Sequence, residues 1–78
     1  MYTRKISLKS IDDIRRFVEN VTNCAYDVDI SAGRYVVDGK SIMGIFSLDL
    51  SCPVTVILRS NDSEECAPFL GFLDRFGA

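Results

Sequence analysis

The sequence predicts a single α+β domain in which four antiparallel strands form one sheet and helices cover one of its faces. Two patterns predict this class: apolar residues recur at helical spacing over residues 10–22, and they alternate with polar residues over residues 26–30. The chain has 78 residues and is 47% hydrophobic, which suits one modest core. We therefore expect residues 1–78 to form one domain.

The first expected elements are a strand and a helix. Residues 2–6 have the composition of a short strand. Ser10 to Thr22 form the clearest helix, with Ser10 as a preferred N-cap and Asp13 in the acidic position of a capping box. The apolar face of this helix consists of Ile11, Ile14, Phe17, Val18 and Val21.

A hairpin and a short helix follow. A half-buried strand over residues 26–30 is expected to turn at Ala32-Gly33 and to return over residues 35–37. Residues 41–48 have room for only about two turns of helix. In that helix Ile45 and Leu48 are the expected core residues.

The last two elements are a strand and a helix. Residues 54–59 are rich in β-branched residues and predict a central strand. Residues 61–63 offer caps for a final helix, but Pro68 suggests that regular helix begins only near Cys66. Its expected buried face consists of Cys66, Phe69, Leu70, Leu73 and Phe76. The element order is thus β-α-β-β-α-β-α.

Composition excludes several classes of function. Nine basic and eleven acidic residues give a net charge of −2, and their scatter argues against a nucleic-acid surface or a polybasic membrane patch. No apolar run approaches the roughly 20 residues of a membrane span or forms a signal peptide, so we expect a cytoplasmic protein. The chain has no histidine, and Cys24, Cys52 and Cys66 form no Cys-x-x-Cys pair. We expect inert thiols, no metal site and no cofactor.

One stretch resembles a known family. Residues 40–48, Lys-Ser-Ile-Met-Gly-Ile-Phe-Ser-Leu, resemble the second helix of HPr, the histidine-containing phosphocarrier protein of the sugar phosphotransferase system. With that anchor the family pattern extends from about residue 8 to residue 76. The resemblance implies an HPr-like open-faced β-sandwich with three helices on one face of a four-stranded antiparallel sheet. The alternative is a ferredoxin-like split βαβ fold, which needs a longer second helix.

The same resemblance implies that the carrier site is lost. The position that matches the family's phosphorylated histidine is Ser10, and Asp12 and Asp13 stand where the family has an arginine and a proline. Phosphoryl transfer through histidine needs an imidazole nucleophile and positive charge. A serine phosphate would be a stable ester, and two aspartates would repel a phosphate dianion. We therefore expect neither an enzyme nor a phosphohistidine carrier, and the simplest role of Ser10 is to cap the helix.

The resemblance also implies a regulatory phosphorylation site at Ser41, beside Lys40. The plain alternative is that Ser41 caps the second helix, and the two roles are compatible. In the HPr family, exposed apolar residues of this helix bind partner proteins. The candidates for a partner surface are therefore Lys40, Ile42, Met43 and Phe46, and the alternative is that the three apolar residues belong to the core or to a self-association contact.

These features predict an HPr-like regulatory or adaptor protein of the phosphotransferase system that binds proteins through its second helix. The expected partners are an HPr-type serine kinase or other phosphotransferase-system and regulatory proteins, and neither nucleic acid nor a membrane. The alternative function is an atypical phosphocarrier component of the same system. A third alternative is an unrelated α+β oligomerisation module whose second helix resembles HPr by chance.

Overall fold

The fold is built on a four-stranded antiparallel sheet. The computed structural model describes residues 1–77. The strands are β1 (Tyr2–Ile6), β2 (Val28–Ala32), β3 (Tyr35–Asp38) and β4 (Val54–Leu58), in the spatial order β1-β4-β2-β3. Every neighbouring pair is antiparallel. The prediction of a central strand over residues 54–59 is confirmed, because β4 pairs with β1 on one side and β2 on the other.

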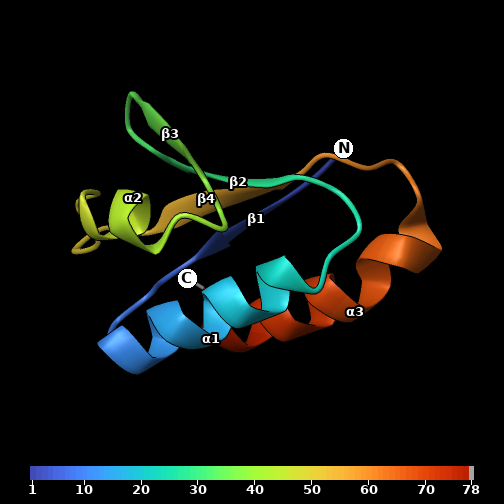
Figure 1. Ribbon diagram of the computed structural model, residues 1–78, viewed down its shortest axis with the longest axis horizontal. Helices are drawn as coiled ribbons and strands as arrows, with labels where there is room; N and C mark the ends of the chain where they lie inside the picture. Colours follow the sequence, from blue (N-terminus) through green and yellow to red (C-terminus); the bar gives the residue numbers. More distant parts are fainter. Residues whose placement is uncertain (78) are drawn as a thin grey trace.

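The helices are α1 (Ile11–Thr22), α2 (Ile42–Phe46) and α3 (Ser63–Leu73), followed by the short 3-10 helix η1 (Asp74–Phe76). In Figure 1, α1 and α3 run along the same side of the sheet, and the short α2 lies beside β3 and also contacts α1. This is the predicted open-faced β-sandwich. The ferredoxin-like alternative is excluded, because it needs a longer second helix to cross back over the sheet and α2 has only five residues. Over residues 1–77, no helix has the length and apolar character needed to cross a membrane.

The core lies between the sheet and the helices. Alternate residues of β2 and β4 point inward, as the pleat of a half-exposed sheet requires. Phe17 of α1 packs against Phe69 of α3 with ring centroids 6.0 Å apart. Ile45 and Leu48 are buried, as predicted. Within the described residues no polar or charged side chain is buried, so the core is apolar throughout.

Three predictions for the first half of the chain are wrong. Ile11 was expected in the core but is exposed, because it lies at the very start of α1, beside a surface groove rather than over the sheet. The strand expected over residues 26–30 begins at Val28. The hairpin turns at Gly33-Arg34, one residue later than expected, and the positive φ of 60° at Gly33 suits a residue without a Cβ.

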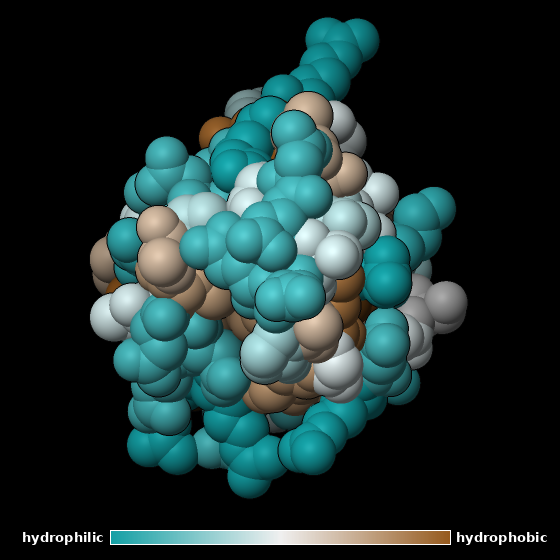
Figure 2. Space-filling model, turned by 90° about the vertical axis from the view of Figure 1, so that its right-hand side faces the viewer, coloured by the Kyte–Doolittle hydropathy of each residue, from teal (hydrophilic) through white to brown (hydrophobic). Residues whose placement is uncertain are grey.

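The start of α3 was also predicted wrongly. The helix begins at Ser63 rather than near Cys66, because the carboxylate of Asp62 accepts hydrogen bonds from the N–H groups of Glu64 and Glu65. Pro68 lies inside the helix and removes one donor, which the rest of the helix tolerates. Cys66, Phe69 and Leu73 are buried, whereas Leu70 and Phe76 are only half-buried. Figure 2 shows the end of the molecule that carries the start of α3, where the surface is mostly hydrophilic around a smaller apolar area.

Candidate functional site

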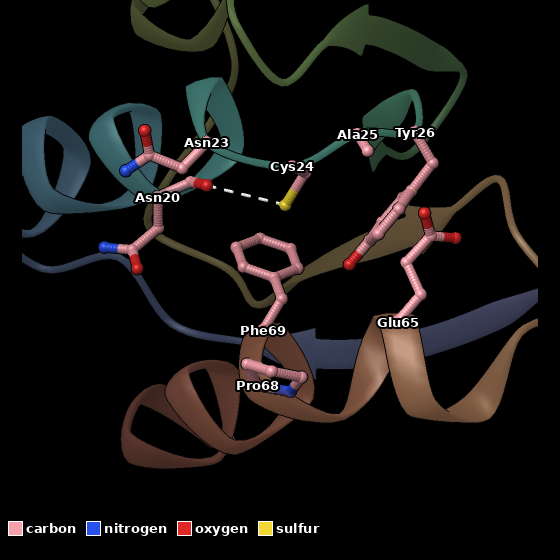
Figure 3. Close-up of a pocket in the computed structure, with 8 residues that line it drawn as sticks. All are labelled: Asn20, Asn23, Cys24, Ala25, Tyr26, Glu65, Pro68 and Phe69. Carbon is pink, nitrogen blue, oxygen red and sulfur yellow. Dashed lines mark hydrogen bonds between the residues drawn. The ribbon is translucent and has the colours of Figure 1, made fainter.

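A hollow of about 300 Å³ lies where the end of α1 meets α3, and two of the three cysteines lie at or near it (Figure 3). The thiol of Cys24 donates to the carbonyl of Asn20 at 3.4 Å, and its partial burial raises its pKa. The hydroxyl of Tyr26 is buried without a hydrogen-bond partner in the described part of the chain. Burial and the nearby thiols of Cys24 and Cys66 raise the pKa of Tyr26 above its usual value. The thiol of Cys24 and the hydroxyl of Tyr26 therefore stay protonated at neutral pH.

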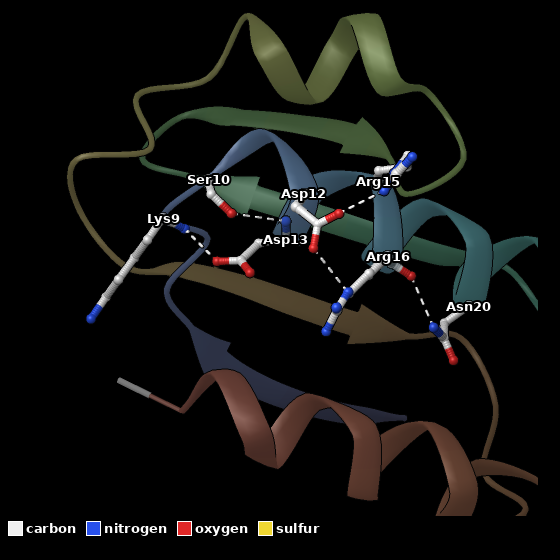
Figure 4. A network of polar contacts seen from close by, with 7 residues as sticks. All are labelled: Lys9, Ser10, Asp12, Asp13, Arg15, Arg16 and Asn20. Carbon is white, nitrogen blue, oxygen red and sulfur yellow. Dashed lines mark hydrogen bonds and ion pairs between the residues drawn. The ribbon is translucent and has the colours of Figure 1, made fainter.

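The start of α1 holds the first candidate residue, Ser10. Its hydroxyl oxygen accepts a hydrogen bond from the N–H of Asp13 at 3.1 Å, so the N-cap prediction is confirmed (Figure 4). The carboxylate of Asp13 accepts from the N–H of Lys9 at 3.0 Å, one residue earlier than in a standard capping box. Two side chains of this chain therefore already occupy the helix end at which an anion could bind.

Asp12, two residues after Ser10, forms ion pairs with two arginines of its own helix. Its carboxylate lies 2.7 Å from Nη2 of Arg15 and 3.0 Å from Nε of Arg16. The hydrogen bond from Arg15 and the charge of Arg16 lower the pKa of the Asp12 carboxyl below its usual value. Both guanidinium groups are thus paired, and Lys9 extends away from Ser10 into solvent (Figure 4). The surroundings of Ser10 offer little free positive charge.

The start of α2 holds the second candidate residue, Ser41. The hydroxyl of Ser41 accepts a hydrogen bond from the N–H of Gly44 at 3.1 Å, which confirms its role as an N-cap. A Cβ at Gly44 would lie 3.0 Å from that hydroxyl oxygen and 3.4 Å from the Cβ of Val37. The glycine therefore lets α2 turn closely around its cap and against β3. Ser41 and Lys40 are both exposed.

Three apolar side chains of α2 face solvent, and the exposure of Met43 and Phe46 is what a partner surface on this helix requires. Ile42 is 38% exposed, Met43 76% and Phe46 45%. Ile11 of α1 is 72% exposed, and it lines one groove together with Phe46 and Ser10. We call the four residues Ile11, Ile42, Met43 and Phe46 the α2 surface. Sequence reasoning missed Ile11 as a member, and the available signal was its position directly after the N-cap.

Metal-binding residues and the remaining cysteine are further candidates for a functional site. Among residues 1–77 no three histidine, cysteine, aspartate or glutamate side chains come together as metal ligands. Cys52, the third cysteine, is exposed and lies apart from the other two. The structure thus brings together the start of α1 and the exposed side of α2, and leaves the cysteines outside that region.

Comparison with known proteins supports the same fold. No protein-family model and no curated protein matches the sequence. The crystal structure of HPr-C-His from Thermoanaerobacter tengcongensis has a TM-score of 0.73 at 22% identity, over 94% of this chain and 89% of that chain. The phosphocarrier protein HPr from Bacillus anthracis str. Ames has a TM-score of 0.67 at 26% identity, over 92% of each chain. This chain has the HPr fold.

The fold brings two of the candidate residues together. Ser10 directly precedes α1 and Phe46 is the last residue of α2, and they line one groove although they are far apart in the sequence. What distinguishes this HPr-fold protein is the chemistry of that region. A capping hydroxyl and two carboxylates stand at the start of α1, and the sequence contains no histidine.

Proposed function

We propose that this HPr-fold protein is a cytoplasmic regulatory or adaptor protein related to the sugar phosphotransferase system, and that it acts by binding other proteins. The observation that carries the proposal is the α2 surface, where four large apolar side chains are exposed and two of them, Ile11 and Phe46, line one groove. Exposed apolar residues that gather in this way mark contact surfaces. Methionine and aromatic residues are also enriched in protein interfaces, and Met43 and Phe46 supply both.

The start of α1 supports binding over phosphate transfer. A phosphocarrier needs a nucleophile whose phosphate is labile and donors that hold the anion. Ser10 would form a stable ester, and its hydroxyl is engaged as a cap. Asp12 pairs with the two nearest arginines, so they are not free for a phosphoryl group. The atypical-carrier alternative therefore lacks both the nucleophile and the anion site.

Regulation by phosphorylation of Ser41 is part of the proposal. Ser41 is exposed at the first turn of α2 and adjoins Ile42 and Met43 of the α2 surface. A phosphate there would accept hydrogen bonds from the N–H groups of that turn and would place negative charge beside the apolar residues. We expect an HPr-type serine kinase to modify Ser41 in preference to other serines.

Mass spectrometry after incubation with such a kinase and ATP tests the regulatory part. The expected product carries one phosphate on Ser41, and Ser41→Ala abolishes it. Ser47 and Ser63 serve as internal controls, because both are exposed. Equal phosphate on these serines, or no phosphate on Ser41, would contradict recognition of the Lys40–Gly44 sequence.

Binding titrations test the partner surface. Phe46→Asp places a charge in the α2 surface, and Val36→Asp makes the same change at an apolar residue of β3 that is 57% exposed. We expect the kinase to bind the parent protein and the Val36→Asp variant alike, and to lose affinity for the Phe46→Asp variant. Equal affinity for all three proteins would show that α2 is not the contact.

A further inference from the structure

The outer face of α3 is apolar although it faces solvent. The buried residues of α3 are Cys66, Phe69 and Leu73, and the opposite side presents Ala67, Pro68 and Gly71, which are all exposed. From residue 66 to residue 73 no side chain carries a charge, an amide or a hydroxyl group. By contrast α1, in the same layer, exposes Asp12, Arg15, Arg16 and Glu19. A helix that is apolar on all sides ordinarily has a neighbour on each of them.

Opposite charges stand at the two ends of this face. At 100° per residue, Glu64, Ala67 and Gly71 lie on one side of α3, and Arg75 follows just beyond the end of that helix, in η1. Glu64 and Arg75 are both exposed, and neither forms an ion pair within residues 1–77. The neighbouring Asp74 does pair, with Arg4 at 3.4 Å. The α3 face, which we define as Glu64, Ala67, Pro68, Gly71 and Arg75, thus carries a free negative charge at one end and a free positive charge at the other.

We propose that the α3 face binds the α3 face of a second copy of this chain, with the two helices antiparallel about a two-fold axis. If Pro68 lies opposite Gly71 of the second copy, Glu64 lies opposite Arg75 of the second copy, and the symmetry repeats both contacts. A parallel pair would instead place like charges together. The charges therefore select the antiparallel arrangement.

The small residues of the α3 face allow the two helices to approach closely. A Cβ built at Gly71 meets no atom within 4 Å, so the monomer itself leaves open space at that position. Pro68 has no N–H to donate to the carbonyl of Glu64, and the guanidinium of Arg75 from the second copy can donate to it. Leu70 and Phe72 are half-buried on either side of the contact. A contact of about three helical turns is small, so we expect a dimer that depends on protein concentration.

The proposed dimer leaves the α2 surface free. α3 packs against β1 and α2 packs against β3, and these two strands are the opposite edges of the sheet. The dimer contact and partner binding therefore involve different residues and can be tested separately.

Sedimentation analysis of the full chain over a wide concentration range tests the dimer. Glu64→Arg or Arg75→Glu alone places like charges together at both symmetric contacts, and we expect each to weaken dimerisation roughly tenfold or more. The double variant restores opposite charges and should regain the dissociation constant of the parent protein. Glu19→Arg makes the same change of charge on the outer face of α1 and should have no effect. Gly71→Gln, at a position with open space in the monomer, should fold and remain monomeric.

Several results would overturn the proposal. They are a protein that stays monomeric at every concentration, a dimer that Glu64→Arg leaves unchanged, and a double variant that dimerises no better than the single variants. Loss of the dimer in Phe46→Asp, with Glu64→Arg unaffected, would assign self-association to the α2 surface instead. Circular dichroism of each variant confirms that it folds before its association is compared.

Discussion

At the start of α1, the side chains of Ser10, Asp12 and Asp13 determine whether the helix N-terminus can bind a phosphate. The hydroxyl of Ser10 is a hydrogen-bond acceptor for the helix, and the carboxylates of Asp12 and Asp13 lie in the same turn. An arriving phosphate dianion would meet these negative charges before it met a free donor. The HPr fold is therefore present without the chemistry of a histidine carrier, because a fold does not by itself specify a function.

We predict that this protein does not relay phosphate from phosphoenolpyruvate. In an assay with enzyme I and labelled phosphoenolpyruvate, the unmodified chain should acquire no acid-labile label. Ser10→His supplies the nucleophile but leaves Asp12 and Asp13 in place, so transfer should remain very weak. Adding Asp12→Arg and Asp13→Pro should increase it, because Arg15 and Arg16 lose their partner and become free. Acid-labile label on the unmodified chain, at a rate comparable to an ordinary HPr, would restore the carrier interpretation.

Asp12 should also make stability depend on pH. Arg15 and Arg16 lower its pKa in the folded state, so its contribution is present above the pKa of the unfolded chain and is lost as pH falls through the folded pKa. Asp12→Asn should therefore lower Tm at neutral pH, and the difference from the parent protein should shrink as pH falls through the lowered pKa of Asp12. Thermal unfolding followed by circular dichroism at several pH values measures this. A difference in Tm that grows as pH falls would contradict the role given to the two arginines.

At the scale of elements, each helix begins where a side chain can serve its free N–H groups. Ser10, Ser41 and Asp62 each accept a hydrogen bond from the first turn of the helix that follows. This explains why α3 starts at Ser63 in spite of Pro68, since the cap satisfies two donors and the proline removes only one. It also explains why α2 can exist with only five residues, because Ser41 caps it and Ile45 anchors it in the core.

Two glycines should respond in opposite ways to the same substitution. Gly71 lies in α3 without positive φ and has open space around it, so Gly71→Ala should stabilise the fold by about 0.5–1 kcal/mol. At Gly39 a Cβ would lie 2.8 Å from the carbonyl oxygen of Val28 and 3.3 Å from a methyl group of Val21. Gly39→Ala should therefore destabilise by about 1–3 kcal/mol. Urea unfolding at low protein concentration compares the two, and a destabilised Gly71→Ala variant would show that α3 is packed more tightly than described.

At the scale of the whole molecule, one apolar core lies on one side of the sheet and two exposed apolar regions lie toward opposite edges. The α2 surface lies beside β3, and the α3 face lies on the side of β1. A small domain with no deep enclosed site has its outer surface as the main means of recognition. The two regions proposed as contacts are therefore separate from each other on the molecule.

The distinction between core and surface should be measurable with two phenylalanines. Phe17 is fully buried against Phe69, so Phe17→Ala should cost about 3–5 kcal/mol of unfolding free energy. Phe46 is nearly half exposed, so Phe46→Ala should cost about 1 kcal/mol or less while weakening partner binding. Chemical unfolding followed by circular dichroism suits this chain, which has no tryptophan. A loss of several kcal/mol in Phe46→Ala would mean that Phe46 belongs to the core.

Much of the fold could be predicted because its signals act over a few residues. Ser10 and Ser41 are caps for the turn directly after them, and the spacing from Ile14 to Val21 predicts a helix from its own length. The candidate site could be predicted only in part. Residues 40–48 pointed to Ser41, Met43 and Phe46 through the resemblance. The position of Ile11 directly after the N-cap suggested exposure, but it did not show that Ile11 lies beside Phe46. Nor could a sequence show that Glu64 and Arg75 both lack an ion pair.

The element order, the helix caps and the absence of a histidine nucleophile follow from short segments or from composition, so they could be predicted from the sequence. The strand order β1-β4-β2-β3 and the surroundings of individual side chains became visible only in the folded chain. The spacing of apolar residues shows which of them share a helix face, but not how far the sheet extends beneath that face. Ile11 therefore shares a face with Ile14 and still lies in solvent beside Phe46. Such surroundings depend on segments far apart in the chain, and only folding brings those segments together.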